Sequence, residues 1–175
     1  MYKSVIFLCS ILFSAHTFAQ TSSPLFNLIN QRLAFMPDVA ANKYQTHQPV
    51  EVLDQEQKVL EKTLNIADIE GLNPESVKPF IVAQMNVAKA VQYRYIADWL
   101  SEPNIQLHPE SLDHIRTHIS DLTVQMMKEI ASRLKRNPSY TFNQNDFMHE
   151  VKFKHLTPSD QKYLLSTLQQ IKLKN

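Results

Sequence analysis

The segment LFNLINQRLAFMPDV at positions 25–39 decides the fold class of this chain. Its apolar residues recur at intervals of three or four, which is the period of an α-helix that buries one face. The residues that set this interval are Leu25, Ile29, Leu33, Met36 and Val39. Pro24 fits the first turn of such a helix, whereas Pro37 removes a backbone donor inside it, so we expect a long helix with a kink.

The rest of the chain repeats this helical periodicity. It predicts further helices over residues 54–69, 73–99, 109–136, 143–151 and 159–173. Gly71 fits the left-handed position just past the first of these, and Asn73-Pro74 fits the start of the next. We therefore expect an all-α fold, a single bundle of about six helices.

Residues 1–19 have the features of a signal peptide. Lys3 supplies the positive start, residues 5–13 form an apolar run too short to cross a bilayer, and Thr17-Phe18-Ala19 forms a cleavage site. The processed chain is expected to begin near Gln20, to be periplasmic or secreted, and to form one domain over residues 20–175.

The charge and cysteine content narrow the choice of partners. Removal of Lys3 with the leader leaves equal numbers of basic and acidic residues, so no long-range attraction to nucleic acid or to anionic lipid is expected. The single cysteine, Cys9, also lies in the leader, so we expect no disulfide. No later apolar run reaches the length of a membrane span.

Several kinds of catalytic site find no support in the sequence. Gly71 is the only glycine, which argues against phosphate-binding loops, dinucleotide fingerprints and glycine-flanked nucleophilic serines. His114 and His118 could hold a metal if a third ligand came from elsewhere, but no Glu lies between them in the order of zinc proteases. We therefore expect neither a metal nor a nucleophile.

Polar residues at helical spacing indicate a different kind of pocket. Arg32 and Lys43 are eleven residues apart, a separation that returns a helical residue to within about 20° of the same direction. Gln84, Ala88 and Gln92 follow at intervals of four on a later helix. A groove lined by cations and amides, without a nucleophile, suits a small dianion.

An ordered set of motifs resembles the secreted, all-helical chorismate mutases. The motifs are Asn30-Gln31-Arg32-Leu33, Val39-Ala40-Ala41-Asn42-Lys43, His47-Gln48-Pro49-Val50-Glu51, Gln55-Glu56, Gln84-Met85, Gln92-Tyr93 and Ala97-Asp98-Trp99. The resemblance is close over residues 25–100 and rests on helix pattern alone over residues 109–175.

The resemblance implies an isomerase of aromatic amino acid biosynthesis that converts chorismate to prephenate. This intramolecular Claisen rearrangement needs no cofactor, because the catalyst has only to orient the substrate and stabilise charge on its ether oxygen. By resemblance, Lys43 and Gln92 donate to that oxygen, Arg32 binds a carboxylate and Glu56 accepts from the substrate hydroxyl. Gln55 and Ala88 line the same pocket.

Three positions depart from the family pattern. Val52 stands where the family often has an aspartate, and Gln55 where many members have an arginine. The arginine that a later helix contributes to bind the second carboxylate aligns best with Gln125. Arg116 is nine residues earlier and about half a turn away in direction, so Lys128 is the better expected substitute.

The resemblance also implies that one chain supplies a whole active site, with residues 25–100 forming the catalytic helices and residues 109–175 completing the pocket. A homodimer is possible. The main alternative is a mutase-like periplasmic binding protein with weak or no activity, given the changes at Val52, Gln55 and Gln125. A structural helical adapter would require Arg32 and Lys43 to face open water.

Overall fold

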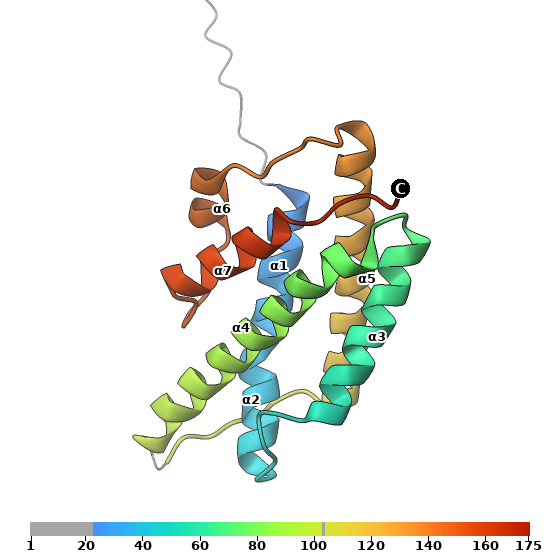
Figure 1. The fold of residues 1–175 in the computed structure, drawn as a ribbon. Coiled ribbons are helices and arrows are strands. Elements are labelled where there is room, and N and C mark those ends of the chain that lie inside the picture. The colour runs from blue at the N-terminus through green and yellow to red at the C-terminus, as the bar shows by residue number, and fades with distance from the viewer. Residues whose placement is uncertain (1–22, 103) are drawn as a thin grey trace, which may run out of the picture.

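The computed structural model describes residues 23–102 and 104–175, so the predicted signal peptide lies outside the described residues. Within them the chain is all-α, as predicted, with no β-strand (Figure 1). The helices are α1 (Pro24–Ala34), α2 (Met36–Gln45), α3 (Leu53–Ile69), α4 (Pro74–Leu100), α5 (Leu112–Arg136), α6 (Gln144–Glu150) and α7 (Pro158–Leu168). None of these helices is long and apolar enough to cross a membrane.

The predicted first helix is divided into α1 and α2. The break lies at Phe35, which caps both helices, and Pro37 follows it in the first turn of α2. A proline is tolerated there because the first amides of a helix have no partner within it. The expected kink is thus a break between two helices, which accounts for the count of seven described helices rather than about six.

Local signals set most helix ends where the sequence predicts them. Gly71 follows α3 with a φ of +84°, the left-handed conformation that glycine adopts without strain. The Asn73 side chain caps α4 by accepting from the amides of Glu75 and Ser76. Thr157 opens α7 with a reciprocal capping box to Asp160.

Two predicted helix boundaries are wrong. Helix α5 begins at Leu112 rather than Pro109, because the Ser111 side chain caps it. The last helix ends at Leu168 rather than near residue 173. Beyond it, Leu173 forms an isolated antiparallel bridge with Leu72, flanked by two 2.9 Å hydrogen bonds, from the Asn73 amide to the Lys172 carbonyl and from the Lys174 amide to the Gly71 carbonyl.

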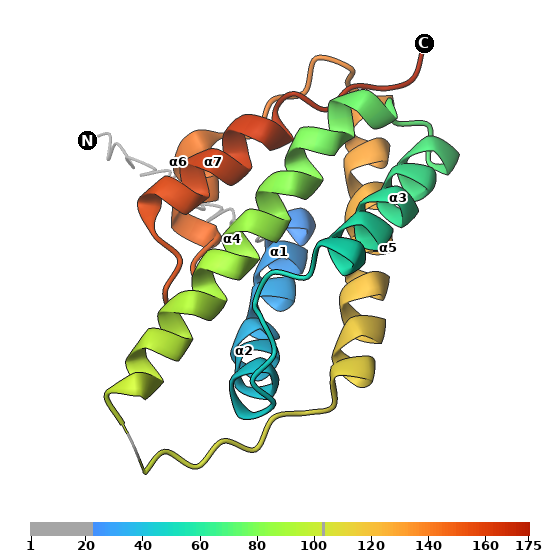
Figure 2. The same cartoon turned by 60° about the horizontal axis from the view of Figure 1, so that its bottom comes forward.

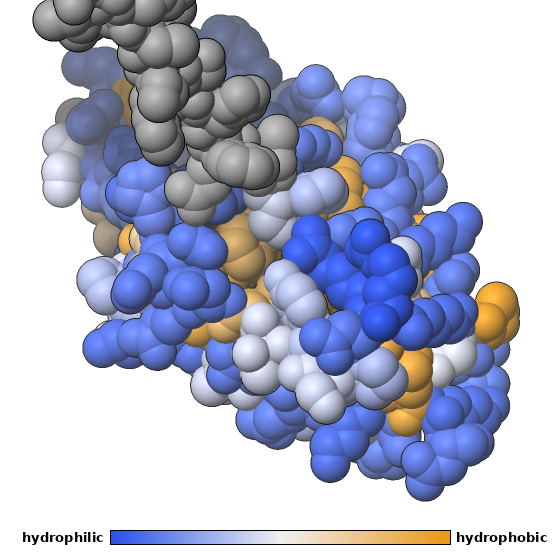
Figure 3. All heavy atoms as spheres, turned by 90° about the horizontal axis from the view of Figure 1, so that it is seen from above, coloured by the Kyte–Doolittle hydropathy of each residue, from blue (hydrophilic) through white to orange (hydrophobic). Residues whose placement is uncertain are grey.

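Helix α4 is the longest element and packs against α2, α3 and α7. Helix α5 packs against α1, α2 and α3. Helices α1 and α2 lie between α4 and α5 (Figure 2). The core between these helices is apolar, with Phe80, Phe147, Leu25 and Met126 among its most buried side chains. The face seen from above is mostly hydrophilic, with hydrophobic side chains visible only in small separate areas (Figure 3).

Candidate active site

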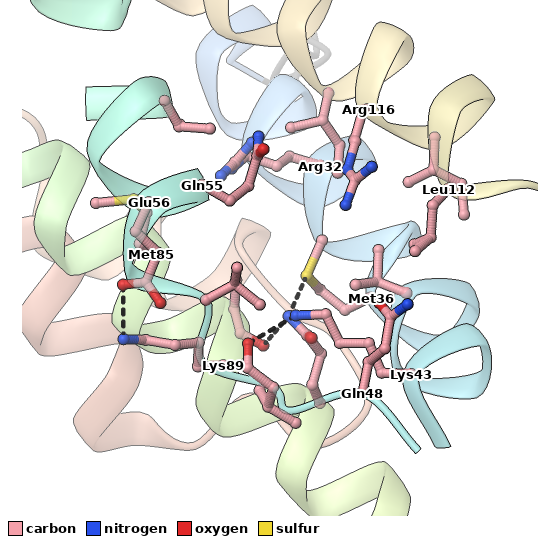
Figure 4. A pocket seen from close by; sticks show the side chains of 18 residues that line it. Arg32, Met36, Lys43, Gln48, Gln55, Glu56, Met85, Lys89, Leu112 and Arg116 are labelled. Atoms are coloured by element: carbon pink, nitrogen blue, oxygen red, sulfur yellow. Dashed lines mark hydrogen bonds and ion pairs between the residues drawn. The ribbon is translucent and has the colours of Figure 1, made fainter. Parts of the chain in front are cut away.

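A cavity of about 160 Å³ lies among α1, α2, α3, α4 and α5. Six residues named from the sequence line it together: Arg32, Lys43, Gln55, Glu56, Ala88 and Gln92. Figure 4 shows Arg32, Gln55 and Arg116 on one side of the cavity and Lys43 and Gln48 on the other. Because α1 to α5 all contribute to its wall, the cavity forms only when the bundle is assembled.

Arg32 is a buried cation without a partner. It lies in the last turn of α1 with 9% of its surface exposed, and its Nη1 atom makes no hydrogen bond. No residue in the described part of the chain forms an ion pair with it. Burial lowers the pKa of Arg32 to about 10. A buried charge of this kind is costly, and a bound anion would compensate it.

Lys43 extends from the last turn of α2 into the same cavity. Its Nζ atom donates to the carbonyl oxygen of Val50 at 2.6 Å, which holds the ammonium in place. Burial lowers the pKa of Lys43; nearby Glu56 opposes this shift, whereas Arg116 and Lys89 add to it. The Val50 carbonyl leaves other Nζ hydrogens available to a ligand, since an ammonium has three donors.

Gln92 lies on α4 and is 5% exposed. Its Nε2 atom donates to the Ala88 carbonyl at 3.2 Å and lies 3.5 Å from the sulfur of Met36, while its Oε1 atom is buried without a partner. The contact with a carbonyl requires a donor, which supports this orientation of the amide. A thioether is a weak acceptor, so a ligand oxygen would compete well for the second Nε2 hydrogen.

Glu56 projects from α3 and pairs with a residue that sequence reasoning did not assign. Its Oε2 atom lies 2.9 Å from Nζ of Lys89, which comes from α4 and also lines the cavity (Figure 4). Its other oxygen, Oε1, is buried and unpaired. Unpaired buried polar atoms are rare in folded proteins, and here three of them belong to residues of one cavity.

The expected substitute for the missing arginine is not the one that the structure places at the cavity. Gln125 and Lys128 lie on a separate surface depression with Gln31. Arg116 lines the cavity instead; it is half-exposed and pairs weakly with Asp113 at 3.3 Å. Arg116 and Gln125 do lie on opposite sides of α5, but the side of Arg116 is the one that faces the cavity, so the expectation of Lys128 is wrong.

Gln84 is also placed differently from the expectation. It is 5% exposed, does not line this cavity, and has its Nε2 atom 3.5 Å from the sulfur of Met126. Residues at intervals of four drift by about 40° each step around a helix, so Gln84 is turned about 80° from Gln92. The stripe of two amides therefore divides between the cavity and the core.

The two histidines of α5 form an exposed pair rather than part of the cavity. His118 Nε2 lies 2.9 Å from His114 Nε2, and His114 Nδ1 lies 2.7 Å from a carboxylate oxygen of Glu110. No group of three metal-binding side chains is found among residues 23–102 and 104–175.

The hypothesis of a structural helical adapter is contradicted, because Arg32 is buried and Lys43 is partly buried in the cavity wall.

The chemistry of the wall limits what the cavity can do. Four cations, Arg32, Lys43, Lys89 and Arg116, face a single carboxylate, Glu56. The described wall contains no serine, threonine, cysteine, histidine or tyrosine that could act as a nucleophile or proton shuttle. Such a cavity can orient a small anion and stabilise negative charge on it.

The fold and the cavity thus define an all-α protein with a cavity whose lining suits a small anionic ligand. The chorismate mutase type II family profile matches residues 21–93. Secreted chorismate mutase of Yersinia pestis is 40% identical over 171 residues, which cover 97% of this chain and 92% of the relative. The chain belongs to the chorismate mutase family.

Further relatives agree with this assignment. Monofunctional chorismate mutase of Enterobacter agglomerans is 36% identical, over 98% of this chain and 94% of the relative. The crystal structure of the Yersinia pestis enzyme matches with a TM-score of 0.81 and 42% identity, over 86% of this chain and 97% of that one. Chorismate mutase from Burkholderia phymatum shares the fold, with a TM-score of 0.71 and 20% identity, over 83% and 94% of the two chains.

Proposed function

We infer that this protein is an isomerase that converts chorismate to prephenate. Its relatives over nearly the whole chain are chorismate mutases, and its cavity has the character that the reaction requires. One observation carries the inference furthest: the buried, unpartnered guanidinium of Arg32 lines the same cavity as Lys43 and Gln92. The nearly full-length Yersinia relative is a secreted enzyme, and this protein is likewise secreted or periplasmic.

The proposed mechanism relies on orientation and electrostatics. Chorismate rearranges by breaking a C–O bond and forming a C–C bond in one step, during which negative charge grows on the ether oxygen. Lys43 would donate to that oxygen through Nζ, and Gln92 would donate through the Nε2 hydrogen that now meets the sulfur of Met36. Preorganised donors of this kind lower the barrier because they need no reorganisation as charge develops.

The substrate carboxylates would be held by cations on two helices that face the cavity. Arg32 of α1 is proposed to bind one carboxylate, which would compensate its buried charge. Arg116 of α5 is proposed to bind the second carboxylate and to give up its weak contact with Asp113. This assigns the second carboxylate to Arg116 instead of Lys128.

The remaining predicted residues would shape the pocket. Glu56 would accept from the substrate hydroxyl through its unpaired Oε1 atom. Ala88 leaves room beside Gln92, and Gln55 offers a neutral contact where an arginine would offer a charged one. The loss of that charge is expected to weaken substrate binding, by about 1 kcal/mol or more in a dry site.

We propose that one chain supplies the whole pocket, since five helices of this chain contribute to its described lining. A homodimer stays a prediction from the family resemblance. Each subunit of such a dimer would hold a complete pocket.

The decisive experiment follows the loss of chorismate absorbance after adding the processed protein at micromolar concentration. Acceleration over buffer, with prephenate as the product, is the expected result. The alternative expected from the sequence, a binding protein that no longer turns over, is motivated by the changes at Val52, Gln55 and Gln125. Binding of chorismate in calorimetry without acceleration would establish that alternative.

A further inference from the structure

Lys89 joins two helices at the wall of the cavity. Its Nζ atom on α4 lies 2.9 Å from Oε2 of Glu56 on α3, and the two side chains are only 18% and 23% exposed. Partial burial shields such a pair from water and salt, so it holds its geometry better than a surface pair. Neither the motifs nor the comparisons assign Lys89 a role.

The pairing leaves the two oxygens of Glu56 in different states. Oε2 is held by Lys89, while Oε1 is buried and has no partner. Glu56 is the single carboxylate among the described lining residues, and the other cations of the wall come from three further helices: Arg32, Lys43 and Arg116. None of these three forms an ion pair with Glu56, so Lys89 is the one cation that fixes its orientation in the described chain.

A glutamate has three side-chain torsions, and an unheld carboxylate would spread over several orientations. A charge-assisted hydrogen bond to one oxygen removes much of this freedom and leaves the other oxygen aimed in a fixed direction. In a catalytic site, such preorganisation is what makes an acceptor effective, because a misplaced group costs activity even when it is present.

We propose that Lys89 is a positioning residue, which holds Oε2 of Glu56 so that Oε1 accepts the hydroxyl of the substrate. The inference rests on the proposed function and deepens it. Lys89 acts through Glu56 and does not itself contact the substrate. An ammonium engaged at 2.9 Å by the carboxylate would have to leave that partner in order to bind a substrate carboxylate.

The test is a double-mutant cycle on the complete processed chain, with kcat and KM for chorismate as the readout. The variants are Lys89→Met, Glu56→Gln and the two combined. Lys78→Met is the matched control, because Lys78 is an exposed lysine on the same helix, outside the cavity. Lys89→Arg keeps the charge and a donor for Oε2, so it tests rescue.

If Lys89 acts through Glu56, Lys89→Met lowers kcat/KM on the order of tenfold in the native background but less than about twofold in the Glu56→Gln background. The division between kcat and KM should match that of Glu56→Gln, and Lys89→Arg should stay within about threefold of native activity. Lys78→Met should have no effect.

Equal losses in both backgrounds would overturn the proposal, since Lys89 would then act on the substrate or on the fold. An unchanged kcat/KM in Lys89→Met would also overturn the proposal. If Lys89→Met does not fold by circular dichroism, Lys89→Gln takes its place in the same cycle, with the same criteria. Activity of the native protein is measured separately, so an active native enzyme with an uncoupled Lys89 rejects this proposal alone.

Discussion

Replacing Arg32 with methionine should make the unliganded protein more stable while removing its activity. The guanidinium is buried, Nη1 has no partner, and burial lowers its pKa to about 10. Lowering the pKa from the ordinary arginine value to about 10, at about 1.4 kcal/mol for each pKa unit, means that folding with this charge buried costs about 3 kcal/mol. Methionine fills the same position with an apolar side chain that carries no charge.

The expected gain in the free energy of unfolding is about 1–3 kcal/mol, because the shorter side chain gives up some packing contacts. For a chain of this size, each kcal/mol raises Tm by about 2–4 °C. Because the folded pKa lies below the unfolded one, the cost of the charge is fully present below pH 10 and disappears only at higher pH. The gain should therefore be the same at pH 6 and at pH 9.

Urea unfolding followed by far-ultraviolet circular dichroism measures this gain, and the chorismate assay measures the loss of activity, expected to exceed about 10²-fold in kcat/KM. A variant destabilised by more than about 1 kcal/mol would refute the reasoning, since Arg32 would then be held by partners in the unliganded protein. A gain that changes between pH 6 and pH 9 would point to another titrating group.

Lys43→Ala should lower kcat by about 10²–10³-fold without unfolding the protein, the usual cost of losing one donor to a developing oxyanion; the chorismate assay checks this. Arg116→Met should raise KM on the order of tenfold, whereas Lys128→Met, at an exposed position on the same helix, should leave KM unchanged; equal effects would reject the assignment. Burial raises the pKa of Asp160, but the hydrogen bonds that its carboxylate accepts outweigh burial and lower the pKa overall. The largest of these contributions comes from Arg94, whose Nη1 donates at 2.6 Å. Asp160→Asn should therefore lower the free energy of unfolding by about 1–2 kcal/mol at pH 7. Urea unfolding should show this difference vanishing as the pH falls through the lowered pKa of the folded state.

The helices could be predicted because their signals are local. Periodicity, the cap at Asn73, the left-handed Gly71 and the Thr157 capping box act within a few residues. The end of α7 depends instead on competition with a distant partner, since Leu173 pairs with Leu72 rather than continuing the helix. No local pattern contains that information.

The cavity was only partly predictable for the same reason. Spacing and resemblance predicted that Arg32 and Lys43 share a pocket, and both line one cavity because α1 and α2 follow each other directly along the chain. The role of Arg116 could not be predicted, because the sequence shows only that it lies opposite Gln125, and the packing of α5 decides which side faces the cavity. Lys89 meets Glu56 across 33 positions of sequence, where no motif links them.

The bridge between Leu72 and Leu173 also bears on the order in which contacts form during folding. The turn that joins α3 to α4 obtains its backbone partners from residues 172–174, about a hundred positions later. Until residues 172–174 have docked, this corner of the fold lacks those partners. We expect the bridge to form after α3 and α4 themselves, whose hydrogen bonds are local, because contacts between distant residues must first overcome the entropy of loop closure.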